Sequence, residues 1–313
     1  MPRAKRAKPR PRKTHNRIVR LVNATPNPFA ALEHALPSSV PSLGDLRKKY
    51  SSRGTIEPMD LFRATSFEII PLSSVQHTII FGRDGGLLGY HIPAAYFSSF
   101  ITPTFSETLV RQLKALPRSC SQKNMQQRRQ IPHTRTYSFW RGYRSQDVLE
   151  YSAAYQRDNR NGEKGKAFVD HCAVLWNAIA NIYKLLWPTS FYNITQTETL
   201  PKHVSPLAYP FVSLTINTGT IESPVIAKPH RDTGDAFYSI SCLYPFGNFT
   251  GGELVLWELE RRIPLKSGDA FLFPAHLITH SNLSVQGERH SMVAYTKEDI
   301  ISYYARHNID NKE

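Results

Sequence analysis

AFYSISCLYPFGNFTGGELVLWELERRIPLKSGDAFLF, residues 236–273, is the stretch that decides the fold. Short apolar segments rich in strand-forming residues alternate here with turn-rich segments, PFGNFTGG at 245–252 and SGD at 267–269. This pattern is typical of an antiparallel barrel or jelly roll with hairpin connections. We therefore predict an α+β fold with a double-stranded β-helix (jelly-roll) core at about residues 205–300, braced by helices on one face.

Three candidate metal ligands flank this stretch. His230 and Asp232 lie two apart in KPHRDTGD, so in an extended strand their side chains point to the same face. His280 follows in FLFPAHLITHSN, and the intervening hairpins would bring it to the same mouth of the barrel. Two imidazoles and one carboxylate form a facial triad that suits non-haem Fe(II) and leaves coordination positions open. His276 lies in the same segment and is a rival to His280.

The last predicted strand, GERHSMVAY at 287–295, carries candidates for binding a cosubstrate. Its alternation places Arg289, Ser291 and Tyr295 on one face. The planar guanidinium of Arg289 can hold a carboxylate through two hydrogen bonds, and Ser291 can bind the same group. Tyr295 would lie further along, toward the reacting centre, although plain strand packing would also explain Ser291 and Tyr295. With the triad, this strand suggests an oxygenase that uses 2-oxoglutarate.

Four motifs follow one another along the chain: KPHRD, FTGGELVLWE, the KSGD turn and H-x8-R-x-S-x3-Y. Together they resemble the TET/JBP family of Fe(II)- and 2-oxoglutarate-dependent nucleic-acid base dioxygenases, in particular its compact fungal forms. The resemblance covers roughly residues 165–300. It implies that His230, Asp232 and His280 ligate iron, that Arg289 and Ser291 bind the 2-oxoglutarate carboxylate, and that Tyr295 lines the pocket for a flipped base.

The chain departs from the animal members of that family at positions that bear on the substrate. Asp235 replaces a base-contacting Asn, and Lys297 replaces a His that follows the pocket Tyr. The cysteine-rich module of the animal members is missing, because this chain has three cysteines and none of them has CxxC spacing. We expect Asp235, Tyr295 and Lys297 to contact the substrate base. An acceptor at Asp235 favours a base with an exocyclic amino group.

The expected reaction is oxidation of the methyl group of 5-methylcytosine to hydroxymethyl, and further. N6-methyladenine demethylation and thymine hydroxylation on the same scaffold stay open. Two other readings are a protein hydroxylase of the prolyl type, which shares the barrel and the order of the triad, and a noncatalytic DNA-binding module. The basic segments weigh against the first, and the complete set of cofactor residues weighs against the second.

Charge indicates a polyanionic partner. The chain has 39 Lys and Arg against 25 Asp and Glu, a formal net charge of +14. Nine of these cations precede the first acidic residue, Glu33, so we expect residues 1–20 to form a disordered basic tail that serves as a nuclear-localisation signal, a nonspecific DNA arm, or both. A merely solubilising tail is the alternative.

Residues 21–60 would be a linker with short helical turns at ALEHAL and GDLRKKY, and residues 61–313 a single dioxygenase domain.

A second basic segment, residues 121–147, interleaves cations with aromatic residues. Cations track phosphates and aromatic faces stack on bases, so this composition suits nucleic acid, although an ordinary strand with a solvated basic face would also give it. The DNA-binding candidates here are Arg128, Arg129, Arg135, Trp140, Arg141 and Arg144.

Four further elements are expected. They are a hairpin over 78–93 that turns at 83–86, a helix over 106–116 capped by Ser106, a helix over 166–186, and a strand in 209–219 with Ser213, Thr215 and Asn217 on one face. We expect no membrane partner, because no apolar stretch is long enough to span a bilayer and no signal peptide is evident. The expected protein is a nuclear monomer acting on methylated double-stranded DNA with its target base flipped.

Overall fold

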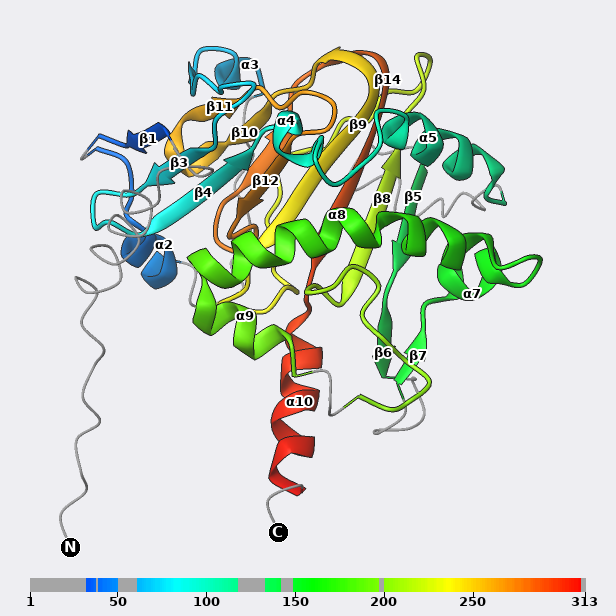
Figure 1. Cartoon of the computed structure of the whole chain (residues 1–313). Coiled ribbons are helices and arrows are strands. Elements are labelled where there is room, and N and C mark those ends of the chain that lie inside the picture. The colour runs from blue at the N-terminus through cyan, green and yellow to red at the C-terminus, as the bar shows by residue number, and fades with distance from the viewer. Residues whose placement is uncertain are drawn as a thin grey trace, which may run out of the picture.

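Two main β-sheets, a two-stranded sheet of β6 and β7, and a layer of helices make up the described part of the protein (Figure 1). The computed structural model describes residues 32–37, 39–49, 61–117, 133–141, 149–196 and 200–310. The strands are β1 (Leu32–Ala35), β2 (Glu68–Ile69), β3 (Thr78–Phe81), β4 (Leu87–Ile92), β5 (His133–Tyr137), β6 (Phe139–Arg141), β7 (Leu149–Tyr151), β8 (Ser213–Thr218), β9 (Ser241–Gly251), β10 (Leu254–Leu256), β11 (Arg261–Ile263), β12 (Ala270–Phe273), β13 (His280–Asn282) and β14 (Val285–Tyr295). The helices are α2 (Leu43–Lys49), α3 (Leu61–Ala64), α4 (Ala94–Phe97), α5 (Phe105–Ala115), α7 (Ala153–Asn159), α8 (Lys164–Leu186), α9 (Pro188–Ile194) and α10 (Glu298–Asp310), with a 3-10 turn η2 (Trp257–Leu259).

The larger sheet has eight strands in the order β1-β3-β4-β12-β9-β14-β8-β5, and the smaller has four in the order β13-β10-β11-β2. Except for the parallel pairs β1 with β3 and β2 with β11, neighbouring strands are antiparallel. From β9 to β14 the chain passes from the larger sheet to the smaller and back twice, through β10 and β11 and then through β13, as in a jelly roll, so the predicted double-stranded β-helix core is confirmed.

Alternation along β9 and β14 separates two apolar cores. Cys242, Tyr244, Met292 and Ala294 pack in the cluster that includes the helices, whereas Leu243 packs in the cluster between the two sheets. Successive side chains of a strand point to opposite faces, so β3, β4, β12, β9 and β14 each contribute to both cores. One face of this sheet is therefore committed to the helices, and the other faces the smaller sheet.

Helix α8 covers the helical face of the larger sheet (Figure 1). Its apolar positions, which recur every three or four residues, are buried, as the sequence predicts for 166–186. Cys172 in this stripe lies 3.6 Å from Met292, measured from sulfur to sulfur, and its thiol pKa is raised by burial. Cys172 is therefore a core residue. Among the helices that the structure describes, none is long and apolar enough to cross a membrane.

Local predictions had mixed outcomes. The hairpin is β3 and β4, with its turn at 82–86, and GDLRKKY forms most of α2. Helix α5 starts at Phe105 with Thr104 as its N-cap, so the predicted cap at Ser106 is wrong. ALEHAL is not a helical turn, because residues 32–35 of it form strand β1, which pairs in parallel with β3. Tertiary pairing outweighs local helix preference there.

The structure contradicts the expected phosphate contact of Arg135. This side chain is 6% exposed, donates a hydrogen bond to the Pro117 carbonyl, and lies 3.3 Å from the Asp158 carboxylate, measured from Nε to Oδ2. The sequence pattern around a cation that faces the interior is the same as that around a cation that faces solvent, so the sequence did not distinguish the two. Trp140 and Arg141 belong to β6, whereas Arg128, Arg129, Arg144 and the basic tail lie outside the described residues.

Asp158 provides a test of this buried pairing. Besides facing Arg135, its carboxylate accepts hydrogen bonds from the Tyr137 hydroxyl at 2.7 Å and from Arg157 Nε at 3.0 Å. We predict that Asp158→Ala lowers the free energy of unfolding by about 3–5 kcal/mol, because it leaves a buried cation without its carboxylate. Urea denaturation measures this change. Arg63→Ala, which removes an exposed ion pair to Glu260, is the control and should change stability far less. Equal losses would contradict the assignment.

Candidate metal and cosubstrate site

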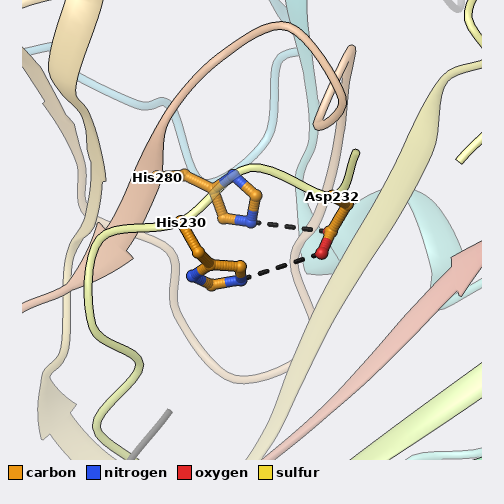
Figure 2. Close-up of side chains that lie close together, drawn as sticks. All are labelled: His230, Asp232 and His280. Carbon is orange, nitrogen blue, oxygen red and sulfur yellow. Dashed lines mark ion pairs between the residues drawn. The ribbon is translucent and has the colours of Figure 1, made fainter. Parts of the chain in front are cut away.

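His230, Asp232 and His280 meet at one place, as the sequence predicts (Figure 2). His280 Nε2 lies 3.7 Å from Asp232 Oδ2, and His230 Nε2 lies 3.9 Å from Asp232 Oδ1. All three ligand atoms are within 4.8 Å of one another. The two histidines are joined by a reciprocal backbone bridge, with N to O distances of 3.0 and 2.8 Å. This bridge ties the segment before β9 to β13.

Both imidazoles are oriented by backbone carbonyls. His230 Nδ1 lies 2.6 Å from the Lys228 carbonyl oxygen, and His280 Nδ1 lies 2.9 Å from that of Ile278. An Nδ1–H that donates to a carbonyl leaves the lone pair on Nε2, which is the form that binds a metal ion. Both Nε2 atoms face the Asp232 carboxylate (Figure 2). Two neutral imidazoles and one carboxylate fit a facial Fe(II) site.

His276, the rival ligand, occupies a different environment. It is 7% exposed, and its ring centre lies 5.4 Å from that of Phe237. Burial lowers the pKa of His276 to about 3, so the ring is neutral at neutral pH. Within the described part of the chain, the cluster of possible ligands contains His280 and not His276.

Two further residues, which sequence reasoning missed, brace the ligand segments. Asn282 accepts a hydrogen bond from the Ala227 backbone N–H at 2.7 Å and donates one to the Val225 carbonyl at 2.9 Å, which fixes the chain leading to His230. Glu258 accepts from both the backbone N–H and the hydroxyl of Thr279, at 2.7 and 2.6 Å. The sequence could have indicated Asn282, because it lies two residues after His280 and therefore on the same side of the strand.

Arg289 lies buried on β14, 3% exposed, with its guanidinium carbon 5.4 Å from the centre of the Phe249 ring. Burial lowers its pKa to about 10, so the group is still a cation at neutral pH. Its Nε–H has no acceptor among the described residues. Gly252, at φ +72°, lies beside this group, because a Cβ added there would be in ordinary van der Waals contact with this Nε, at 3.5 Å. A buried cation with an unsatisfied donor is suited to an anionic ligand.

The strand face that carries Arg289 continues as a polar surface across β14, β8 and β5, and its hydroxyl and amide groups form two short hydrogen-bonded chains. In one chain Asn217 donates to Ser291 Oγ at 3.4 Å and accepts from Thr134 Oγ1 at 3.1 Å. In the other, Thr215 Oγ1 lies 3.3 Å from the Tyr295 hydroxyl and 3.2 Å from Thr136 Oγ1. The predicted parity of both strands is confirmed, and Ser213, Thr215 and Asn217 share this face.

Asp235 and Lys297, the expected base contacts, are neighbours. They face each other in an isolated antiparallel bridge. Asp235 is 8% exposed and accepts a hydrogen bond from Ser241 Oγ at 3.0 Å, whereas Lys297 is half-buried. The structure thus brings the two positions together beside the end of β14. It gives Asp235 a protein partner that the sequence did not predict.

Comparison with known proteins identifies the domain. Residues 143–298 match Tet_JBP, the oxygenase domain of the 2OGFeDO superfamily. No curated protein sequence is similar enough to serve as a relative. The structure is similar to that of NgTET1 in complex with 5mC DNA, with a TM-score of 0.51 and 16% identity over 71% of this chain and 77% of that one.

Two further structures are more distant. One is an oxidoreductase of the 2OG-Fe(II) oxygenase family from Burkholderia pseudomallei, with a TM-score of 0.40 and 13% identity over 66% of this chain and 82% of that one. The other is a viral collagen prolyl hydroxylase from Paramecium Bursaria Chlorella virus-1, with a TM-score of 0.35 and 12% identity over 67% and 96%. These two likenesses carry no argument about function. By its domain at residues 143–298, this chain belongs to the TET/JBP family of Fe(II)- and 2-oxoglutarate-dependent dioxygenases.

Proposed function

We propose that this dioxygenase acts on DNA and oxidises the methyl group of 5-methylcytosine in a flipped base. The observation that carries the proposal is the facial triad of His230, Asp232 and His280, combined with a buried Arg289 whose Nε–H lacks an acceptor among the described residues. The TET/JBP domain match and the likeness to NgTET1, a structure with 5mC DNA, support the choice of substrate.

The residues present fit both cofactors. His230, Asp232 and His280 would hold Fe(II) through two Nε2 atoms and a carboxylate, and Arg289 with Ser291 would hold the distal carboxylate of 2-oxoglutarate. When bound, the metal and cosubstrate would supply the oxidation of a C–H bond to C–OH by dioxygen, with one oxygen atom entering the substrate and the other entering succinate as 2-oxoglutarate loses carbon dioxide. The Lys228 and Ile278 carbonyls would hold the Nε2 lone pairs toward the position of the metal, and burial keeps water from the Arg289 site.

Base recognition would fall to the end of β14. Thr215 meets the Tyr295 hydroxyl and so fixes the ring that would stack on the flipped base. The Asp235 carboxylate would accept from an exocyclic amino group, which suits cytosine and also adenine. The triad side chains are only 10–18% exposed, and a stacked base cannot reach ligands at that depth. Flipping is therefore part of the proposal.

An exposed aromatic residue on the segment that carries Asp232 would contribute to DNA contact. Tyr238 is 61% exposed, and the Arg47 guanidinium carbon lies 5.5 Å from its ring centre. Lys48 and Lys49, also exposed, follow Arg47 in α2. Cations beside an aromatic face suit a nucleic-acid backbone and its bases. The basic tail as a nuclear-localisation signal and DNA arm, and the monomeric state, stay predictions.

The test of the substrate is mass spectrometry of digested nucleosides. DNA carrying 5-methylcytosine or N6-methyladenine is incubated with Fe(II), 2-oxoglutarate and the protein, with His230→Ala as the inactive control. We expect 5-hydroxymethylcytosine, or more oxidised cytosines, with the wild type alone. Loss of N6-methyladenine alone would move the assignment to adenine. Succinate formation with neither base changed would overturn the proposed substrate and leave the iron site standing.

The choice between the two candidate histidines can be tested by metal binding. We predict that His280→Ala lowers Fe(II) content at least tenfold under anaerobic loading, because it removes one of three ligands. His276→Ala should retain most of the metal and of the turnover, since His276 lies outside the cluster. Metal analysis of the purified variants, with circular dichroism to verify folding, measures both. The reverse pattern would make His276 the ligand.

Arg289→Lys tests the cosubstrate site. Lysine keeps the positive charge but cannot reproduce the guanidinium fork, so we predict 2-oxoglutarate binding weaker by about tenfold to a hundredfold, or roughly 1.4–2.8 kcal/mol. Calorimetric titration of 2-oxoglutarate into the metal-loaded protein gives this value. Arg111→Lys, on the exposed side of α5, is the matched control and should bind as the wild type does. Unchanged affinity in Arg289→Lys would place the carboxylate elsewhere.

A further inference from the structure

A cavity of about 530 Å³ opens on the helical side of the protein, between α7, α8 and the segment at 205–209. This volume is in the range of pockets that bind small ligands. Its aromatic and acidic lining residues are Tyr151, Tyr155, Glu163, Asp170, Trp176 and Tyr209. None of them belongs to the iron or cosubstrate site.

The larger sheet separates this cavity from the metal site. α8 packs on the face of β14 that carries Met292 and Ala294, whereas Arg289 and Ser291 lie on the opposite face. A ligand in the cavity would therefore not contact iron, 2-oxoglutarate or the flipped base. The cavity is a second site.

The lining is aromatic at its base and along its sides. Trp176 is 1% exposed and Tyr155 is 9% exposed, so both lie at the base of the cavity. Tyr151 lies against Tyr155, with ring centres 4.9 Å apart and planes inclined by 52°. Tyr209, from the segment at 205–209, is 42% exposed and packs edge to face on Phe191. Rings from β7, α7, α8 and the segment at 205–209 thus line one space, and Tyr209 is the most exposed of them.

The charge of the cavity is opposite to that of the chain. Glu163 and Asp170 contribute two carboxylates, against one cation, Lys166, which pairs with Asp170 at 2.7 Å. Both carboxylates also act on Tyr155, whose pKa is raised to about 12, mainly by burial. On a chain of net charge +14, this local excess of negative charge disfavours phosphate and favours a cation.

A buried donor gives a second, independent indication of a ligand. The indole Nε1–H of Trp176 has no acceptor within the described part of the chain. A buried N–H without an acceptor is costly, so a ligand that brings a carbonyl or hydroxyl oxygen would stabilise it. The cavity therefore suits a cation that carries such an acceptor nearby.

We propose that this cavity binds a methylated ammonium group, enclosed by the tyrosine and tryptophan rings and balanced by Glu163 and Asp170. Aromatic faces attract cations through their quadrupole, and a methylated ammonium is only weakly hydrated and so easily desolvated. Two sources share this chemistry, a methylated lysine side chain of another protein and a small quaternary amine. The cavity volume of about 530 Å³ favours the peptide, which would fill more of it than a small amine does, whereas the hydroxyl of a small amine such as choline would supply an acceptor for the Trp176 N–H.

Calorimetric titration with choline and with its neutral carbon isostere, 3,3-dimethylbutan-1-ol, tests the charge requirement. We expect choline to bind at least tenfold more tightly, because the two molecules differ only in the positive charge. Equal binding of the isostere would overturn the proposal, since an apolar pocket alone would then explain the affinity.

Variants locate the binding. Tyr209→Ala and Asp170→Asn alter exposed side chains and should each weaken choline binding at least threefold, while iron-dependent succinate formation stays unchanged. Tyr192→Ala, at an exposed tyrosine that is not among the residues lining the cavity, is the matched control and should have no effect. Undiminished binding in both cavity variants would contradict the site.

A third arm separates the two sources. A short peptide with trimethyllysine is compared with the same peptide carrying unmodified lysine, and with choline. Binding of the trimethyllysine peptide at least tenfold tighter than both would assign the cavity to a protein partner. Equal affinity for that peptide and choline would support a small amine as the ligand. Preference for the unmodified lysine would overturn the proposal.

Discussion

The backbone bridge between His230 and His280 is the constraint on which the site depends. It joins a segment with no regular structure to β13, the edge strand of the smaller sheet, and so fixes two ligands in one step. Asn282 holds the preceding residues from the same strand, and the backbone N–H of Asp232 donates to the Ala275 carbonyl at 3.0 Å. Two ligands that are close in sequence and a third from a later part of the chain thereby acquire the preorganisation that a metal site needs.

The larger sheet assigns opposite tasks to its two faces. Met292 and Ala294 pack toward α8 and stabilise the fold, while Arg289 and Ser291, at alternate positions, face the inside with polar neighbours. Burying a guanidinium costs several kcal/mol. β14 tolerates this cost because it is hydrogen-bonded to a neighbouring strand on each side, β8 and β9. Binding of an anion would recover part of it. Stability and ligand binding are therefore coupled through one strand.

The sequence predicted those features that periodicity and spacing determine. Parity placed Arg289, Ser291 and Tyr295 on one face, and the resemblance to the TET/JBP family favoured His280 over His276, because only His280 has the family's nine-residue spacing to Arg289. Composition failed for Arg135, because a cation that faces inward toward Asp158 and one that faces solvent look alike in a sequence. Local periodicity failed for residues 32–35, whose strand depends on pairing with β3. Both failures arise from contacts between segments far apart in the chain.

The polar chains behind the site suggest why the inner face tolerates so many buried hydroxyls. Thr136 lies directly opposite Thr215, and Tyr295 lies two residues beyond Val293, the register partner of Thr215, so each group finds its partner on the neighbouring strand at 3.2–3.3 Å. Such a ladder satisfies donors without water, and it fixes the rotamer of Tyr295 through the sheet itself. The orientation of the ring that would meet a base is thus a property of strand register. A one-residue slip of β8 would turn Thr215 to the helical face and remove that support.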